Sequence, residues 1–543
     1  MHETPGSQAG SLAGHPTDPM HANPSVEVRP NTREADVRIV LPKRDAIQNS
    51  FSAAYQAQLP WSQTSVRSRA RILARFASLL VDRRKELAAT ITVPSRSGYQ
   101  ETLTAELLPL ADAARWVGQS APEVLAPRYL GSSGRPLWLG RLKAAVHRVP
   151  HGLVLIIGTW NYSIFLTGVQ ILQALAAGNA VAIKPAPGCE ATTRMLVEIL
   201  LDCGVPDHLM VILDSSIEAG KLAIDIGVDH IVMTGSSQSG RTVLSQAIPS
   251  LTSATMELSG SDAVYVLPGA DLHRVCDLLR FGLRLNGGAT CISPRRVFVP
   301  EKISEVFHRL IAERLAEPEQ QQWRTYVAPS THKKLWDGVQ EALEHGASLI
   351  AGDRMSHSTQ PKNTQHPSGW MSSGLVVLTD VRAGMKLYSQ DIFAPLLMIV
   401  PVESWSDALK TDSQCPYALA ASIFGPYEDA LRLVPFISAG TITINDMIVP
   451  TADPRLPFGG RGESGFGVTR GSEGLLSMTT IKVVSTRLGA WLPHTKLPQP
   501  GDEQLLDGLL QFLHGRGWKK KLGGLRQIVQ AVLSQRKRSK KND

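Results

Sequence analysis

Three short apolar runs in the middle of the chain limit what it can fold into. They read LVLII at 153–157, AVAI at 180–183 and HIVMT at 230–234, and helical segments lie between them. A run of this length without alternating polar residues is typical of a strand buried on both faces. Strands that alternate with helices form βαβ units, which build a parallel sheet covered by helices. The sequence therefore predicts an α/β fold.

The same alternation resumes later in the chain and predicts a second sheet. RRVFVP at 295–300 precedes a long helical stretch, after which GLVVL at 374–378 and PLLMIVPV at 395–402 again have the composition of buried strands. We therefore expect two α/β domains.

The two ends of the chain differ in composition from the middle. Residues 1–35 are rich in Pro, Gly, Ser and His and lack periodicity, which is typical of a disordered leader. No basic segment followed by an apolar run opens the chain, so no signal peptide is expected. Residues 489–543 form a basic tail with apolar residues at helical spacing.

The net charge of +8 arises in that tail. Residues 515–543 hold ten Lys and Arg residues and one acidic residue, so the rest of the chain carries −1. This placement argues against a nucleic-acid-binding body. An apolar face beside a dense basic face suits an anionic membrane surface, although a tail folded onto the body is an equal alternative. No stretch is apolar for long enough to span a bilayer.

The five cysteines are scattered and none forms a CxxC pair, so neither a metal site nor a disulfide framework is expected. A reducing, cytoplasmic compartment is the simpler interpretation. One cysteine, Cys291, lies in NGGATCISPRR, where small residues let the backbone and a ligand approach closely, as a nucleophile requires. A buried structural cysteine is an equal alternative.

Two polar residues are candidates for the chemistry of such a nucleophile. Glu257 lies in ATMELSG among apolar and small residues, which would raise its pKa toward the range of a general base. Asn161 follows the first buried run in GTWNY, where its amide could donate to a developing oxyanion. Taken alone, each residue fits an ordinary structural role better, as an ion-paired glutamate and as an Asx turn.

Two further features suit a phosphate-bearing ligand. Lys184 ends the second predicted strand, at the edge where parallel sheets bind ligands. The turn GSSQSG from Gly235 to Gly240 joins the third strand to a helix expected to begin near Arg241. The turn lacks the GxGxxG fingerprint, so an ordinary strand-to-helix turn remains an alternative.

Taken in order, seven motifs resemble those of the aldehyde dehydrogenase superfamily: GTWNY, GNAVAIKP, TGSSQSG, MELSG, NGG-x-x-C, QDIFAP and LPFGGRGESGFG. The similarity runs from about residue 40 to about residue 488 and is greatest to the class-3-like branch, which includes fatty and aromatic aldehyde enzymes. It implies two Rossmann-like parallel-sheet domains with a small bridging hairpin. The implied parts are a cofactor-binding domain at 36–262, with the hairpin at about 136–150, a catalytic domain at 263–445, and a return segment with an oligomerisation strand at 446–488.

The resemblance implies NAD(P)-dependent oxidation of an aldehyde to a carboxylic acid. Cys291 would form a thiohemiacetal and then a thioester, Asn161 would stabilise the oxyanion, and Glu257 would activate the hydrolytic water. The expected cofactor is NAD, with NADP tolerated because Pro187 stands where many NAD-preferring relatives carry Glu. The implied cofactor-binding residues are Thr159, Trp160, Lys184, Gly235, Ser236, Gly240, Asp391 and Phe393.

Some positions depart from the family pattern. Asp391 stands where Glu is usual, and Ser259 stands where Gly is usual. Ala394, Ala289 and Ser163 replace a Gly, a Gln and a Pro. These departures concern the cofactor contacts and the surroundings of the cysteine more than the three catalytic candidates.

Two alternative functions share this fold. One is a coenzyme A-acylating aldehyde dehydrogenase, although such relatives tend to lack the glutamate base. The other is a catalytically idle scaffold, because a fold alone does not establish an activity. The presence of Cys291, Glu257 and Asn161 argues against both. The resemblance also implies a homodimer, in which RLKAAVHRV at 141–149 and TTIKVVST at 479–486 would pair across subunits.

Overall fold

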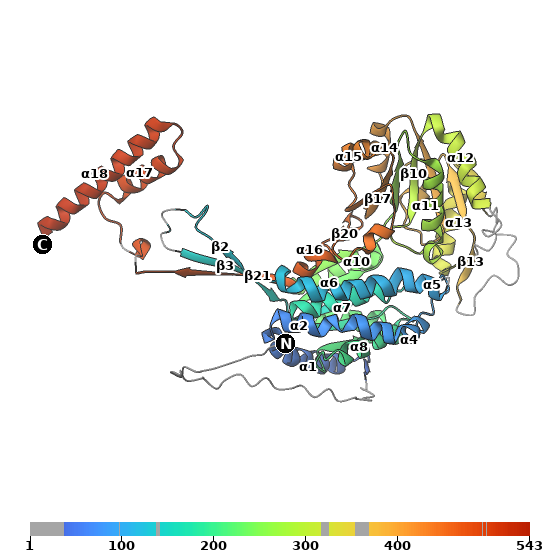
Figure 1. Cartoon of the computed structure of the whole chain (residues 1–543), viewed down its shortest axis with the longest axis horizontal. Helices are drawn as coiled ribbons and strands as arrows, with labels where there is room; N and C mark the ends of the chain where they lie inside the picture. Colours follow the sequence, from blue (N-terminus) through green and yellow to red (C-terminus); the bar gives the residue numbers. More distant parts are fainter. Residues whose placement is uncertain are drawn as a thin grey trace, which may run out of the picture. The chain divides into compact units, whose positions relative to one another are not determined.

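The computed structural model describes residues 37–96, 98–136, 139, 142–316, 325–352, 369–490, 492–495 and 497–542. The leader expected at 1–35 lies outside these residues. The chain divides into two compact units, drawn in Figure 1. The larger comprises Met1–Pro122 with Pro150–Met478, and the smaller comprises Glu123–Val149 with Thr479–Asp543.

The first sheet of the larger unit contains the three buried runs that the sequence predicted as strands. Its order is β1 (Ile39–Val40), β6 (Met210–Leu213), β5 (Ala180–Lys184), β4 (Leu153–Ile157), β7 (His230–Thr234), β8 (Ser253–Glu257) and β20 (Gly465–Phe466). Neighbours from β1 to β8 are parallel, and β20 is antiparallel to β8. After β4 the chain adds strands first on one side and then on the other. A sheet wound in this way leaves a crevice at the carboxyl end of β4 and β7.

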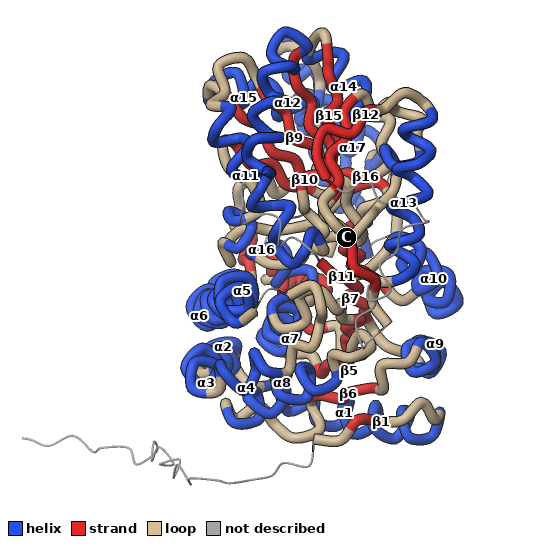
Figure 2. The backbone as a smooth tube through the Cα atoms, turned by 90° about the vertical axis from the view of Figure 1, so that its right-hand side faces the viewer, coloured by secondary structure: helices blue, strands red, loops and turns tan. Residues whose placement is uncertain are grey.

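Helices cover both faces of this sheet, with α7 and α8 on one side and α9 and α10 on the other (Figure 2). Every residue of α7 (Phe165–Ala177) is buried, as expected for a helix that is apolar on all sides. The other helices of this half are α1 (Arg44–Gln63), α2 (Val66–Ala74), α3 (Phe76–Asp82), α4 (Arg84–Ala89), α5 (Tyr99–Thr102), α6 (Leu108–Val124), α8 (Glu190–Asp202), α9 (Ile217–Ile226), α10 (Ser237–Ala247) and α16 (Gly471–Ser477).

The second sheet confirms the second α/β region. Its order is β12 (Ser348–Gly352), β14 (Val376–Thr379), β15 (Leu396–Val402), β10 (Pro294–Pro300), β9 (Asp262–Val266), β17 (Ala420–Phe424) and β18 (Thr441–Ile444). Only the edge strand β12 is antiparallel to its neighbour.

Alternate residues of its central strands belong to two separate apolar clusters. Tyr265 and Phe298 pack with α13 (Pro329–Glu344), α14 (Trp405–Asp412) and α15 (Tyr427–Leu433). Val264 and Val297 pack with α11 (Leu272–Arg284) and α12 (Glu301–Ala316) on the other face. Because successive side chains of a strand point to opposite faces, these runs are apolar throughout.

The smaller unit contains a three-stranded sheet in the order β2 (Arg128–Leu130), β3 (Leu142–Pro150) and β21 (Thr479–Arg487). The expected hairpin therefore begins near residue 128 rather than 136. Within this chain β21 lies beside β3 in the sheet, and the expected pairing of these strands across subunits stays a prediction. Chain connectivity allows this, since β3 directly precedes, and β21 directly follows, the Pro150–Met478 part of the larger unit.

The tail of the smaller unit is a helical hairpin of α17 (Asp502–His514) and α18 (Trp518–Asn542). The helices approach closely at two glycines, where a Cβ on Gly508 would lie 2.8 Å from the carbonyl oxygen of Gly524. Among the helices that the structure describes, none combines the length and the apolar character needed to cross a bilayer.

Candidate active site

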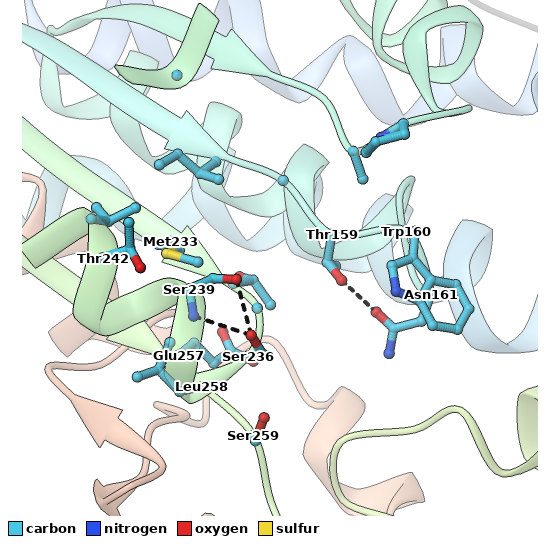
Figure 3. Close-up of a pocket in the computed structure, with 18 of the residues that line it drawn as sticks. Thr159, Trp160, Asn161, Met233, Ser236, Ser239, Thr242, Glu257, Leu258 and Ser259 are labelled. Carbon is cyan, nitrogen blue, oxygen red and sulfur yellow. Dashed lines mark hydrogen bonds between the residues drawn. The ribbon is translucent and has the colours of Figure 1, made fainter. Parts of the chain in front are cut away.

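A cavity of about 570 Å³ lies at the carboxyl end of β4 and β7. The three catalytic candidates Cys291, Glu257 and Asn161 all line it. The cofactor candidates that line it are Thr159, Trp160, Lys184, Gly235, Ser236, Asp391 and Phe393. Figure 3 shows Thr159, Trp160 and Asn161 on one side of this cavity, with Ser236, Ser239 and Glu257 on another.

Cys291 is presented by a tight loop after α11. Asn286, Gly287 and Gly288 have φ angles of 51°, 59° and 78°, a left-handed run that favours glycine. A Cβ on Gly288 would lie 2.6 Å from the carbonyl carbon of Ala394, so no other residue fits there. Cys291 is partly exposed, whereas the other four cysteines are buried. Its backbone N–H makes no hydrogen bond to any described residue.

The thiol of Cys291 has acidic neighbours. Burial raises its pKa above the ordinary value, and the carboxyl groups of Glu257 and Asp262 raise it further. The guanidinium of Arg470 acts in the opposite direction. The resting thiol is therefore protonated at neutral pH, and its reactivity depends on the charges around it.

Glu257 ends β8 and is only 3% exposed. Its Oε2 accepts a hydrogen bond of 3.0 Å from the Thr469 hydroxyl, while Oε1 is buried without a partner among the described residues. Burial raises the pKa of Glu257, and Arg470 and the Thr469 bond lower it in part. The direction agrees with the sequence expectation, because desolvation penalises the charged form.

Asn161 lies between β4 and α7 and is held through both its backbone and its side chain. Its Oδ1 accepts from the Thr159 hydroxyl at 2.7 Å, and its Nδ2 donates to the carbonyl oxygen of Ala289 at 2.9 Å. Asn286 Nδ2 donates to the Asn161 carbonyl at 2.9 Å. These bonds fix Asn161 against the loop of Cys291.

At the far side of the cavity, the N-terminus of α10 and Lys184 are suited to a polar, phosphate-bearing ligand. Ser236 caps the helix by accepting from the backbone N–H of Ser239 at 3.2 Å. The helix begins at Ser237, four residues earlier than expected, because this cap starts it. Lys184 is buried and its ammonium has no partner among the described residues. An unpaired buried ammonium and free helix N–H groups fit the hydroxyls and phosphates of a dinucleotide.

The loop before β15 lines the cavity beside the Cys291 loop. Its Asp391 accepts a hydrogen bond from Ser259, and its Phe393 lies with its ring centroid 5.9 Å from that of Trp160. Arg295 joins the two loops, since its guanidinium donates to the carbonyls of Ala394 and Gly288 at 2.6 and 2.5 Å. Both walls of the cavity are therefore held in one hydrogen-bonded framework.

Comparison with known proteins identifies the family. The sequence matches the model of the aldehyde dehydrogenase family over residues 21–484. The chain belongs to this family. The NAD(P)-dependent oxidation of an aldehyde is the family's general reaction, and the enzyme class and fold class expected from the sequence are confirmed. Assignment to the class-3-like branch stays a prediction.

Relatives align with most of the chain. A 4,4'-diapolycopene aldehyde oxidase from Methylomonas is 30% identical over 478 residues, which cover 86% of this chain and 87% of the relative. A betaine aldehyde dehydrogenase from Sinorhizobium fredii is 28% identical over 472 residues, or 85% of this chain and 93% of the relative.

Solved structures share the fold. The aldehyde dehydrogenase of Mycobacterium tuberculosis complexed with NAD+ has a TM-score of 0.73 at 24% identity, covering 83% of this chain and 92% of that one. An NADP-dependent glyceraldehyde-3-phosphate dehydrogenase from Bacillus halodurans complexed with NADP has a TM-score of 0.72 at 26% identity, covering 82% and 92%.

One expected cofactor residue has a different place in this aldehyde dehydrogenase. Gly240 does not line the cavity. It lies one turn into α10, where a Cβ would come within 2.7 Å of the Leu258 side chain. The glycine therefore permits close packing of α10 against the segment after β8, which the turn pattern alone could not distinguish from ligand contact.

Several residues around the site were missed by sequence reasoning. Thr469 bonds to Glu257, and the charge of Arg470 acts on Glu257 and Cys291, although both residues are far from these groups in the sequence. Trp370 packs edge-on against Trp160, with ring centroids 5.2 Å apart. Thr469 and Arg470 are separated from the SGFG motif only by Val468, but this position in the sequence does not indicate that they contact the end of β8.

Proposed function

We propose that this aldehyde dehydrogenase oxidises its substrate through a covalent thioester on Cys291. The observation that carries the proposal is that one cavity is lined by a partly exposed thiol, a buried carboxyl group and a fixed side-chain amide. A nucleophile, a base and oxyanion donors facing one cavity are the parts that acyl chemistry on an aldehyde requires.

The roles follow from the contacts. The Cys291 thiol loses its proton to solvent, and the thiolate sulfur adds to the aldehyde carbon. The resulting oxyanion would accept from the Cys291 N–H and from the second N–H of the Asn161 amide. When bound in the cavity, a nicotinamide dinucleotide would supply the acceptor for the hydride that the thiohemiacetal loses as it becomes a thioester on Cys291. Glu257, with its raised pKa, takes a proton from water, which attacks the thioester carbon. The carbon–sulfur bond then breaks, releasing the carboxylic acid and the thiol.

We propose NAD as the cofactor, with NADP tolerated. Lys184 and the N-terminus of α10 would hold the adenosine and phosphate groups, while Asp391 and Phe393 would hold the nicotinamide nucleoside. The lining around Lys184 includes a second cation, Lys221, and Pro187, and it contains no carboxylate other than Glu257 and Asp391. Asp214 and Glu190 act on Lys184 electrostatically but do not line the cavity, so a phosphate on the ribose would meet no further carboxylate in the lining.

The two alternative functions have less support. A coenzyme A-acylating enzyme does not need a general base. Glu257 is buried and hydrogen-bonded, and its raised pKa suits such a base. A catalytically idle scaffold does not require a cavity in which hydrogen bonds between separate segments hold Asn161 against the loop of Cys291. Hydrolytic aldehyde oxidation explains both arrangements.

The test of this proposal uses two variants and a matched thiol control. Cys291→Ala should abolish NAD-dependent oxidation of a panel of aldehydes while cofactor binding persists. Glu257→Gln should give a burst of reduced cofactor followed by slow turnover, because hydrolysis of the thioester needs the base. Cys189→Ala, which removes a buried thiol outside the cavity, should keep activity. Steady-state activity in Cys291→Ala would refute the proposal.

A separate proposal concerns the hairpin of α17 and α18. Large apolar side chains are exposed on it: Leu506, Leu510, Phe512, Trp518, Leu522, Leu525, Val529, Val532 and Leu533. Lys519, Lys520 and Lys521 lie at the start of α18. A surface that is both apolar and cationic fits the interface of a bilayer that contains anionic lipid. We infer that the hairpin attaches the enzyme to such a surface.

A further inference from the structure

Arg470 is a buried cation with no acidic ion-pair partner among the described residues. It directly follows Thr469, precedes α16 and is 5% exposed. Its backbone has a φ of 61°, an unusual conformation for a residue with a side chain. Strained backbone of this kind is concentrated at functional sites.

The guanidinium of Arg470 is held by neutral groups. Nη1 donates to the carbonyl oxygen of Thr451 at 2.5 Å, and the guanidinium carbon lies 4.2 Å from the centroid of the Phe458 ring and 5.5 Å from that of Phe165. Nε is buried without a partner among the described residues. Two aromatic faces and one carbonyl stabilise a buried guanidinium without neutralising it. The positive charge therefore remains available to its surroundings.

That charge lies next to the two reacting groups of the proposed mechanism. Thr469, the preceding residue, bonds to Glu257, and the Phe458 ring that the guanidinium faces belongs to an apolar cluster against which Cys291 packs. The charge of Arg470 is therefore within electrostatic reach of both Glu257 and Cys291. Burial lowers the pKa of Arg470, and its interactions with Glu257 and Cys291 raise it. The carboxyl of Glu257 and the thiol of Cys291 thus share one cation.

The other charged groups that face Cys291 are three acids and one arginine. Glu257, Asp262 and Asp391 disfavour the thiolate. Arg295 is also within electrostatic reach of the thiol, but it is coupled as well to Asp391 and Asp262. Arg470 differs from Arg295 because its interactions are with Cys291 and Glu257.

We propose that Arg470 is a positioning residue whose permanent charge favours the thiolate of Cys291 before attack and the carboxylate of Glu257 during hydrolysis. The proposal rests on the roles assigned above to those two residues. One cation can serve both steps, because the sulfur is neutral once it is bound in the thioester. The charge then acts on Glu257 alone, at the step in which that carboxylate must accept a proton.

The test measures the thiol directly and needs no turnover. The rate at which iodoacetamide alkylates Cys291 is followed against pH by mass spectrometry of the intact enzyme and its peptides. Arg470→Gln retains a donor for Thr451, and Arg470→Met retains the apolar stem. If one of these neutral variants fails to fold, the other still tests the loss of charge. Both should raise the apparent pKa of alkylation by about one unit, which makes alkylation about tenfold slower below that pKa. Arg470→Lys should restore most of the rate.

Arg69→Met is the matched control. Arg69 is also a buried arginine bonded to backbone carbonyls, of Ala176, Trp61 and Thr64, but its pKa is affected by burial and not by Cys291 or Glu257. This variant should lose thermal stability and keep the wild-type alkylation profile. Wild-type profiles in folded Arg470→Gln and Arg470→Met would overturn the proposal. That outcome is distinct from failure of the proposed function, which an active Cys291→Ala variant would reveal.

Discussion

The hydroxyl of Ser259 donates a hydrogen bond of 2.5 Å to Oδ2 of Asp391. Both residues depart from the family pattern, in which Gly and Glu are usual at these positions. Asp391 has a shorter side chain than Glu, and Ser259 supplies a partner that Gly cannot. The bond lowers the pKa of Asp391, which burial otherwise raises. We propose that the two departures compensate each other at this point of the cavity wall.

From this relationship we predict that Ser259→Ala weakens cofactor binding about tenfold, since a hydrogen bond to a charged group contributes about 1.5–3 kcal/mol. The measurement is the dissociation constant for NAD from tryptophan fluorescence. Ser245→Ala, an exposed serine of α10, is the control. The double variant Ser259→Gly with Asp391→Glu should bind NAD more tightly than Ser259→Gly alone. Equal affinities in the two would contradict compensation.

Thr469→Val removes the hydrogen bond that stabilises the carboxylate of Glu257. Because that bond lowers the pKa of Glu257, its loss raises the pKa further above the ordinary value. A smaller fraction of Glu257 is then ionised at a given pH, so the acidic limb of the kcat profile should move to higher pH. We expect kcat near neutral pH to fall about tenfold, which corresponds to about 1.4 kcal/mol. Thr469→Ser should retain the wild-type profile, and an unshifted limb in Thr469→Val would argue against the bond.

The positive charges of Lys184 and Lys221 in the cavity lining predict that the enzyme tolerates NADP. The ratio of kcat/KM for NAD and NADP should remain well below a thousandfold, which corresponds to about 4 kcal/mol. Pro187→Glu, which introduces a carboxylate into the lining, should increase the preference for NAD by repelling the extra phosphate. A wild-type preference of a thousandfold or more would refute this prediction.

The edge strand β21 predicts a homodimer. Ile481, Val483 and Val484 are 57%, 61% and 45% exposed, and an apolar strand at the edge of a sheet is a site for pairing with another chain. Val483→Lys should shift the enzyme from dimer to monomer in sedimentation velocity. Leu251→Lys, at an exposed leucine of the larger unit, should leave the mass unchanged. A wild-type monomer at micromolar concentration would contradict the prediction.

The hairpin of α17 and α18 predicts binding to anionic vesicles. The full chain should co-sediment with vesicles that contain phosphatidylserine and should dissociate from them as the salt concentration rises. It should not bind vesicles of phosphatidylcholine alone. A chain that ends at Pro500 should stay in the supernatant and keep its activity. Trp518→Ser should weaken binding without changing charge, because that exposed indole suits the interface. Full-length protein that remains in the supernatant at low salt would refute membrane attachment.

The sequence by itself determined three strands of each large sheet, which are β4, β5 and β7 in the first and β10, β14 and β15 in the second, and the segments that hold Cys291, Glu257 and Asn161. These features depend on neighbouring residues, since apolar runs and small-residue loops act over a few positions. The tertiary structure alone decided that Thr469 bonds to Glu257, 212 positions away, and that β21 lies beside β3 of its own chain. It also placed Gly240 in packing rather than in the cavity. Such contacts join distant segments, and only the folding of the whole sheet brings those segments together.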